Sequence, residues 1–468
     1  MTPPHVVDPA ITAAIPIVAE RPPWSEMFVA LKVRNYQLFA SSNLVQNTGN
    51  WMQRIAMDWL VLQLTGSPTA VGITMAMQFT PMIFLGLFGG IVADRFPKRN
   101  LLVGTQSAAA LLAALMAVLT LTGIVTVWDI WAVSALLGVV TVVDNPARQV
   151  FVNELVGPTY LRNAISINSS IFQLGGLVGP ALAGVLIAVI GGGWMFTVNA
   201  VGCALVVTNL FRIRAGELYA APVVPRGKGQ LVEGLAYVLR KPPILWTIVM
   251  MALVAVFAQS MPVFLTSFAN DVYHVGAGGY GMFNALVACG ALAGALLSTR
   301  RATVRLRLTV SGGAVVGGTQ LVAGLMPDEW SFVAVLVSFG LANLLFITAA
   351  NQLVQMSSNM RVRGRVMALY ILVWLGGQAV GGPVSGWAVE TFGPHLAMAL
   401  TGSVPLVCAG VIAASLARRG RLRVRLTLHH AVPRLGIVRR ESRLAVSHPQ
   451  SSPAGRRHTR RLRRRRPA

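Results

Sequence analysis

Long apolar segments are the feature that most restricts how this chain can fold. A helix needs about 20 predominantly apolar residues to cross the hydrocarbon core of a bilayer, and windows of that length recur along the sequence. Only 12% of the 468 residues are charged, against about 25% in an ordinary soluble domain. We therefore predict an all-α membrane protein with twelve helices, near residues 37–64, 69–93, 101–124, 128–152, 163–190, 193–212, 244–269, 276–298, 308–326, 331–354, 365–389 and 393–417.

The positions of Lys and Arg predict how these helices are oriented. Cytoplasmic loops of membrane proteins are enriched in Lys and Arg. If both termini are cytoplasmic, every Lys and Arg except Arg54 falls on the cytoplasmic side, whereas the outer loops carry acids such as Asp129, Asp328 and Glu390. We therefore expect a multi-pass protein of the cytoplasmic membrane with both termini inside.

An internal repeat divides the chain into two halves. Gly179-Pro180 is matched 203 residues later by Gly382-Pro383, and Gly90 is matched 204 residues later by Gly294. Two related halves around a site near the middle of the membrane are typical of secondary transporters. We predict a cytoplasmic segment over 1–36, six-helix bundles over 37–213 and 244–417, a linker over 214–243 with a short amphipathic helix over 231–239, and a tail over 418–468.

The tail is strongly basic. It holds seventeen of the 39 Lys and Arg residues, and such a composition predicts disorder because it cannot bury a core. The role we favour is attachment to anionic lipid of the inner leaflet; a solvated tail without function and a frame error in a GC-rich gene are the alternatives. Nucleic-acid binding is not expected, because no aromatic residue is interleaved with the arginines.

The first apolar segment carries a polar stripe. A helix turns by about 100° per residue, so its polar residues fall within an arc of about 80°. A charge at the bilayer centre costs roughly 2.5–3.5 kcal/mol, and intramembrane charges therefore indicate a functional site. The stripe must face another helix or a water-filled cavity. Its members are Asn43, Asn47, Asn50, Arg54 and Asp58.

Two interpretations of the charged pair remain open. Arg54 and Asp58 are four residues apart and can form an ion pair, which would be a neutral structural clamp while the asparagines bond neighbouring helices. Alternatively, Asp58 loads and releases protons, and Arg54 either holds it ionised or binds an anionic group of the substrate. A partner that comes and goes changes the affinity of a carboxylate for protons, which would couple proton movement to transport. Asp144 is the second candidate proton carrier.

The loop after the second segment carries Gly90, Asp94, Arg95, Lys98 and Arg99. This pattern resembles the signature loop between helices 2 and 3 of the major facilitator superfamily, with Pro97 where that family usually has Gly. The resemblance implies that the loop forms a cluster with Asp144 and Arg148. We favour a structural latch for this cluster, one that would hold one conformation of the two halves and break as they rock.

Further motifs resemble the subgroup of that superfamily containing the enterobactin exporter and macrolide efflux proteins, over roughly residues 34–417. They are Asn50-Trp51-Met-Gln-Arg54, Asp94-Arg95-Phe-Pro-Lys-Arg99, Pro146-Ala-Arg148-Gln and Arg363-Gly-Arg365-Val-Met. By this resemblance helices 1, 4, 7 and 10 line the substrate cavity, which adds Gln259, Asn343 and Asn351 to the polar stripe.

The fifth segment contains a pattern of small residues that resembles the antiporter motif of the superfamily. Small residues at four-residue spacing let helices approach closely, and a proline permits a bend. The resemblance implies export rather than import. The residues are Gly175, Gly179, Pro180, Ala183 and Gly184, with Ala183 where the motif has glycine.

Together these features predict a monomeric secondary transporter that exports a small, partly apolar organic molecule, such as a siderophore, antibiotic or drug, in exchange for protons. No nucleotide-binding signature occurs, and the three cysteines lie in apolar runs, so we expect no ATP drive, enzyme activity, cofactor or metal site. The alternatives are an importer or facilitator of the same fold and a membrane anchor that presents the basic tail.

Overall fold

The computed structural model describes residues 28–219, 230–298, 305–359, 362–419, 422–429 and 432–439. Our predictions for the N-terminal segment before residue 28, for part of the linker, for Arg300 and Arg301, and for lipid binding by residues 440–468 lie outside the described residues. The chain divides into two units, residues 1–412 and residues 413–468, and each is described by itself.

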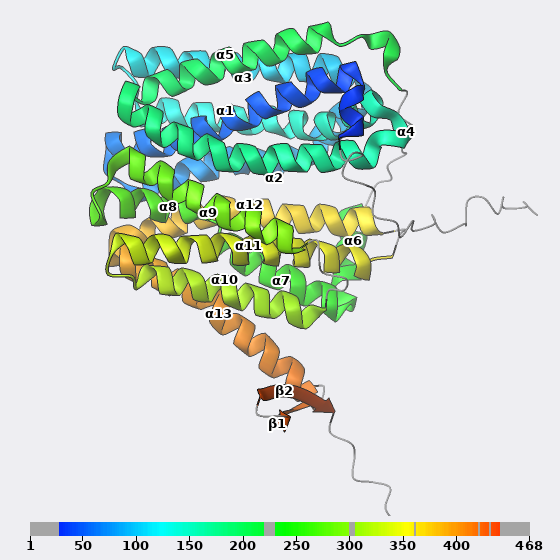
Figure 1. The fold of residues 1–468 in the computed structure, drawn as a ribbon, viewed down its shortest axis with the longest axis vertical. Helices are drawn as coiled ribbons and strands as arrows, with labels where there is room; N and C mark the ends of the chain where they lie inside the picture. Colours follow the sequence, from blue (N-terminus) through cyan, green and yellow to red (C-terminus); the bar gives the residue numbers. More distant parts are fainter. Residues whose placement is uncertain are drawn as a thin grey trace, which may run out of the picture. The chain divides into compact units, whose positions relative to one another are not determined.

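The first bundle occupies the upper half of Figure 1. The longest of its helices, α4, contains two of the predicted segments, and a kink at Gly157 separates them. Gly157 has a φ of 63°, which L side chains rarely adopt. The short helices η3 (Val29–Lys32) and η4 (Ala215–Glu217) flank the bundle. Its main helices are α1 (Arg34–Thr65), α2 (Pro68–Arg95), α3 (Lys98–Leu121), α4 (Val127–Ile190) and α5 (Gly192–Arg212).

The second bundle occupies the lower half of the same view (Figure 1). The linker helix α6 (Gln230–Arg240) packs against α7 and α12 and coincides with the predicted amphipathic helix. The bundle consists of α7 (Pro242–Phe257), α8 (Met261–Ser267), the π-helical η5 (Phe268–Val272), α9 (Gly276–Ser298), α10 (Leu306–Gly324), α11 (Glu329–Ser357), α12 (Arg363–Phe392) and α13 (Pro394–Arg419).

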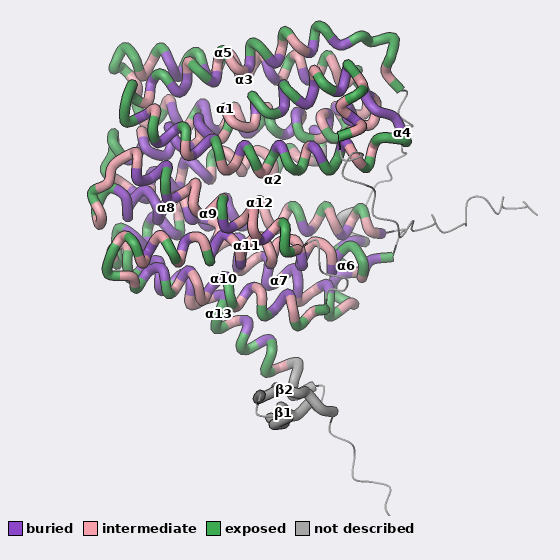
Figure 2. Tube along the Cα trace, in the orientation of Figure 1, coloured by how far each residue is buried: buried purple, intermediate pink, exposed green. Residues whose placement is uncertain are grey.

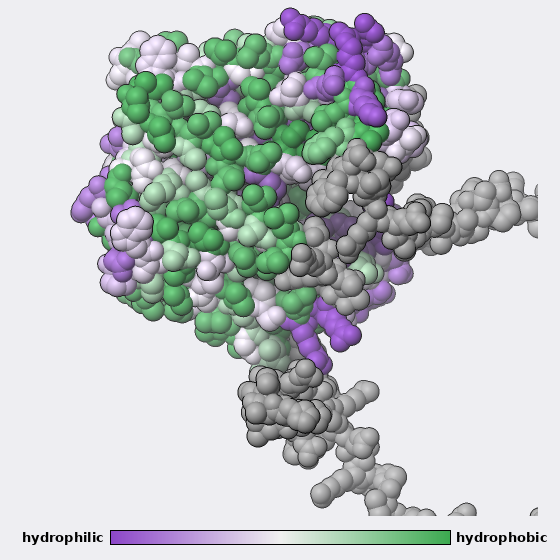
Figure 3. Space-filling view, in the orientation of Figure 1, coloured by the Kyte–Doolittle hydropathy of each residue, from purple (hydrophilic) through white to green (hydrophobic). Residues whose placement is uncertain are grey.

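The surface agrees with a membrane protein. Within the described ranges, nine helices are long and apolar enough to cross a membrane, and α4 is one of them. Helices α1 and α10 are not among the nine, so twelve crossings remain a prediction. In Figure 2, exposed residues follow the outward sides of the helices and buried residues lie between them, and in Figure 3 hydrophobic side chains cover most of the visible face. The all-α membrane fold is confirmed for the described residues of the first unit.

The second unit contains a strand pair. Strands β1 (Leu422–His429) and β2 (Val432–Arg439) are antiparallel, with Leu422 opposite Arg439 and His429 opposite Val432. This differs from the disorder predicted for the tail. Arg alternates with Leu and Val from residue 421 to 426, and such alternation is typical of a strand, whereas the prediction of disorder rests on composition alone.

Two close helix contacts join the bundles near the loop that contains Gly66. We call this side of the molecule the Gly66 end, and the opposite side, with the loop after α2, the Asp94 end. A Cβ atom added to Gly72 of α2 would collide with the carbonyl group of Gly382 on α12. On the other side of the interface, a Cβ atom added to Gly281 of α9 would collide with the backbone of α4 at Gly184. We call these contacts the α2/α12 seam and the α4/α9 seam.

The two seams use the repeated Gly-Pro motif in related ways. Gly184 belongs to the motif of the first half, and Gly382 belongs to its copy in the second half. Each copy therefore packs against the other bundle. Because glycine has no side chain, the backbones approach closely enough for extensive van der Waals contact.

We expect the substitution Gly281→Val to hold the bundles apart at the Gly66 end, because its side chain would meet backbone atoms that cannot move without separating the helices. The distance between spin labels at Ile124→Cys and Leu325→Cys, in a chain without native cysteines, should shift to longer values. Gly278→Ala on the same helix is the control, since a Cβ atom there has no neighbour within 4 Å. An unchanged distance in Gly281→Val would contradict this account of the seam.

Candidate transport site

The polar stripe of α1 ends at a hydrogen bond between the two bundles. The hydroxyl group of Tyr280 on α9 donates to Oδ2 of Asp58 at 3.0 Å, and both side chains are buried. The ring of Trp59 stacks on Tyr280 with centroids 6.1 Å apart, and the amide of Asn284 donates to the Tyr280 carbonyl at 2.9 Å. A carboxylate of the first bundle is thus held by a hydroxyl group of the second.

Arg54 does not form the ion pair with Asp58 that its spacing allows. Among the described residues the ion pairs within 4.0 Å are Lys98–Glu154, Arg148–Asp144 and Arg214–Glu217. The guanidinium of Arg54 instead lies over two aromatic rings, 5.1 Å from the centre of Trp51 and 5.6 Å from that of Phe79. Such cation–π contacts contribute about 0.5–2 kcal/mol each, so the rings stabilise this charge while Tyr280 binds the acid.

The asparagines of the stripe have different surroundings. Asn43 accepts a hydrogen bond from Arg148 and donates one to Asn168 at 3.3 Å. Asn47 is half-buried and packs against Gly175 of α4. Asn50 is exposed. The stripe therefore has a bonded residue at each end and more open polar groups, Asn50 and the half-buried Arg54, between them.

Asp144 lies in a dense polar network inside the first bundle. Arg148 donates to both of its carboxylate oxygens, at 3.0 and 3.2 Å. Thr105 and Gln106 of α3 donate to Oδ1 at 2.8 and 2.9 Å. These partners and Asn43 all belong to α1, α3 and α4. The described contacts of this network stay within one bundle, where they join three helices.

The structure divides the predicted cluster around the signature loop. Gly90, Asp94 and Arg95 lie in the last two turns of α2. Arg99 turns towards the end of α5, where it donates to the carbonyl oxygens of Leu210 and Phe211, each at 2.8 Å. It therefore caps the negative end of that helix rather than pairing with Asp144.

Lys98 has a second helix as its partner. Its Nζ atom lies 3.5 Å from the carboxylate of Glu154 on α4, and the Glu154 carbonyl accepts a hydrogen bond from the backbone of Tyr219 at 2.8 Å. The signature loop is thereby connected to α4 and to the chain that follows α5, all on the side of the first bundle.

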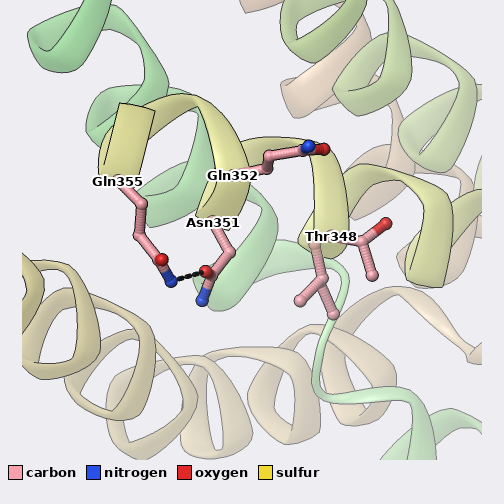
Figure 4. Close-up of a pocket in the computed structure, with 5 residues that line it drawn as sticks. Thr348, Asn351, Gln352 and Gln355 are labelled. Atoms are coloured by element: carbon pink, nitrogen blue, oxygen red, sulfur yellow. Dashed lines mark hydrogen bonds between the residues drawn. The ribbon is translucent and has the colours of Figure 1, made fainter. Parts of the chain in front are cut away.

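The candidate residues of the second bundle form two separate pairs. The amide of Gln259 donates to Asn343 at 3.0 Å. Gln355 donates to Asn351 at 2.5 Å, as Figure 4 shows. The second pair belongs to a pocket of about 360 Å³ on one side of α11, lined by Ile347, Thr348, Asn351, Gln352 and Gln355.

The antiporter motif packs in two directions. Gly175 and Gly179 accommodate Asn47 and Trp51 of α1, and Gly184 meets α9 of the other bundle. Pro180 and Ala183 are buried between these contacts. The motif therefore places the polar stripe against α4 and the first bundle against the second.

Sequence reasoning missed several partners in this site. Tyr280 and Gln106 lie in apolar segments and were not singled out, although each is a lone polar group of a kind that is usually bonded when buried. Trp51 appeared only as part of a motif and Phe79 not at all. The acidic residue Glu390 was expected in an outer loop, and its hydrogen bonds with Ser67 and Thr69 of the first bundle were not foreseen.

The architecture and the site together define a class. Two bundles with related motifs, close helix seams at one end and a buried carboxylate between them are the construction of a secondary transporter. The family model for transmembrane secretion effectors matches residues 26–428. The chain belongs to this family of the major facilitator superfamily, whose members are transporters rather than enzymes.

Curated relatives agree with this assignment at low identity. The uncharacterized MFS-type transporter YfiS of Bacillus subtilis is 25% identical over 395 residues, which is 80% of this chain and 90% of the relative. Multidrug efflux pump Tap of Mycolicibacterium fortuitum is 26% identical, covering 81% and 95%. Enterobactin exporter EntS of Citrobacter koseri is 26% identical, covering 76% and 86%.

Solved structures show the same fold. The nucleoside transporter NupG superposes with a TM-score of 0.66 at 14% identity, covering 81% of this chain and 98% of that one. A bacterial homologue of the lysosomal transporter Spinster, in an inward-facing and unoccupied conformation, gives 0.65 at 16% identity, covering 82% and 97%. At these identities the likeness concerns the fold alone.

We expect Arg148→Met to destabilise the protein by about 3 kcal/mol, because it leaves the buried Asp144 carboxylate without its countercharge. The measurement is the thermal midpoint in detergent. The double variant Asp144→Asn with Arg148→Met is the control, since it removes both charges and should recover much of the loss. An equal loss in the single and double variants would contradict the assignment of the effect to an unpaired acid.

Proposed function

We propose that this transporter exports a small, partly apolar organic molecule across the cytoplasmic membrane in exchange for protons, with both termini and the Asp94 end in the cytoplasm. The observation that carries the proposal is the hydrogen bond from Tyr280 to Asp58. It places a buried acid at the surface where the two bundles must separate for the site to open at the Gly66 end.

The charge distribution supports the orientation. Arg95, Lys98 and Arg99 lie at the Asp94 end, as expected for a cytoplasmic face. Exposed tryptophans lie near the starts of helices at the Gly66 end, among them Trp128 and Trp330, and tryptophan is enriched where helices leave a bilayer. With this orientation, the seams close the external side.

The position of Asp58 supports proton exchange. When the Gly66 end is open, Asp58 meets external water and accepts a proton. Closing this end buries the group again, and burial costs much less for a neutral carboxyl than for an ionised one. Once the end is closed, the hydroxyl of Tyr280 donates to the carboxylate, and Arg54, one helical turn closer to the cytoplasm, adds a positive charge. Both offset part of the cost of burying the ionised acid, so the proton is released to the cytoplasm when that side of the stripe is open to water.

The half-exposed middle of the stripe supports a substrate site on the cytoplasmic side of Asp58. Arg54 lies over the aromatic rings of Trp51 and Phe79, and Asn50, one helical turn earlier, is exposed. Mixed aromatic and polar surfaces suit partly apolar organic molecules. Two of the relatives, an enterobactin exporter and a multidrug efflux pump, support the siderophore, antibiotic or drug class.

We expect Asp58→Asn to abolish proton-driven accumulation of substrate in inside-out vesicles while leaving exchange of labelled for unlabelled substrate intact, because a neutral amide cannot carry the proton. The probes are a catecholate siderophore, a macrolide and ethidium. Asp129→Asn, which removes an acid of the first bundle that bonds Thr126 in its own helix cap, is the control. Proton-driven accumulation that persists in Asp58→Asn would sink the proton role.

The same vesicles distinguish export from the other functions. An importer or facilitator would give no accumulation in inside-out vesicles, while whole cells would take the probe up. A chain truncated after residue 417 should keep full export under our proposal. Loss of all phenotype on that truncation would instead favour a membrane anchor that presents the basic tail.

A further inference from the structure

The outer end of the α2/α12 seam carries a charged contact between the bundles. Glu390, in the last turn of α12, accepts a hydrogen bond from the Ser67 hydroxyl and one from the backbone N–H of Thr69 at 3.2 Å. Ser67 is the N-cap of α2 and accepts from the N–H of Ala70. A carboxylate of the second bundle therefore sits on the N-terminus of a long helix of the first.

The spacing of small residues brings the carboxylate to this place. Gly382, Gly386 and Glu390 follow one another at intervals of four residues, and so share one face of α12. Gly382 meets Gly72, and Gly386 meets the backbone at Pro68 and Thr69. Because these contacts bring the helix backbones together, the next residue on the same face reaches the first N–H groups of α2.

The N-terminus of α2 is a favourable partner for an acid. The first N–H groups of a helix have no partner within it, and the helix dipole adds a partial positive charge there. Residue Glu390 itself is exposed, so the contact can exchange its partner for water when the bundles separate. Separation of the bundles at the Gly66 end would move Glu390 away from Ser67 and Thr69, because these partners belong to the other bundle.

The α4/α9 seam has no equivalent group at the matching place. By the repeat offset of 203 residues, Ile187 of α4 is the equivalent in the first half of Glu390 in the second. Ile187 is a buried apolar residue. The two seams are alike in their glycine contacts and differ at their outer ends. One ends in a charge-assisted contact and the other in an apolar one.

We propose that Glu390 is a positioning residue that sets the balance between the closed and open states of the Gly66 end by binding the N-terminus of α2 in the closed state alone. Glu390 affects the transport cycle by changing the fraction of molecules in which the two bundles are closed at the Gly66 end. This role requires neither a particular substrate nor proton coupling.

The test is the distance between spin labels at Ile124→Cys and Leu325→Cys, measured without substrate or proton gradient. We expect Glu390→Ala to lower the ratio of closed to open molecules roughly two- to five-fold, the factor for a loss of about 0.3–1 kcal/mol, as is typical of an exposed charge at a helix N-terminus. Glu390→Gln keeps an acceptor oxygen without the charge and should give an intermediate shift. Glu390→Asp should give the shift closest to that of the native protein.

Glu329→Gln is the matched control, because it removes an acid from the second bundle at the same end, in the first turn of α11. It should leave the distances unchanged. The proposal is overturned if Glu390→Ala has the native distribution, or if Glu329→Gln shifts it equally. If Glu390→Ala fails to fold, Glu390→Gln is the test: a shift towards the open state supports the proposal, and a native distance distribution overturns it. Since no transport is measured, failure of the exporter proposal leaves this result intact.

Discussion

The close approach of glycine backbones at the two seams is the constraint on which the rest of the structure depends. Without side chains at Gly72, Gly382, Gly184 and Gly281, the two bundles meet through their main chains. Only at that separation can Tyr280 reach Asp58 and Glu390 reach the start of α2. The polar contacts between the bundles therefore depend on the close packing of the glycine backbones. They would be lost if that packing were lost.

Polar groups inside the first bundle have two kinds of partner. Asp144 is surrounded by donors from its own bundle, so movement between the bundles leaves its hydrogen bonds unchanged. Asp58 depends on a donor from the other bundle. Of two buried acids that look alike in sequence, one is suited to hold helices together and the other to sense a change of conformation.

The sequence was sufficient for the helical fold of the two bundles, because its signals are long and repeated, whereas the strand pair after them was missed. Apolar windows, the Gly-Pro repeat and the signature loop each extend over many residues, so the helices and the family followed from them. The site was less predictable, because hydrogen bonds between distant helices depend on rotation about each helix axis. Helical spacing allowed Arg54 and Asp58 to pair, whereas the tertiary structure supplied aromatic rings to one and a tyrosine to the other.

The single residue that interrupts α4 has a mechanical consequence. The two arms of this helix, before and after Gly157, meet at a kink, where the glycine has a positive φ that costs it little. Rotation about this one residue would change the angle between the arms while the backbone hydrogen bonds within each arm stay intact. The first bundle therefore carries a pivot of one residue between its fourth and fifth predicted segments.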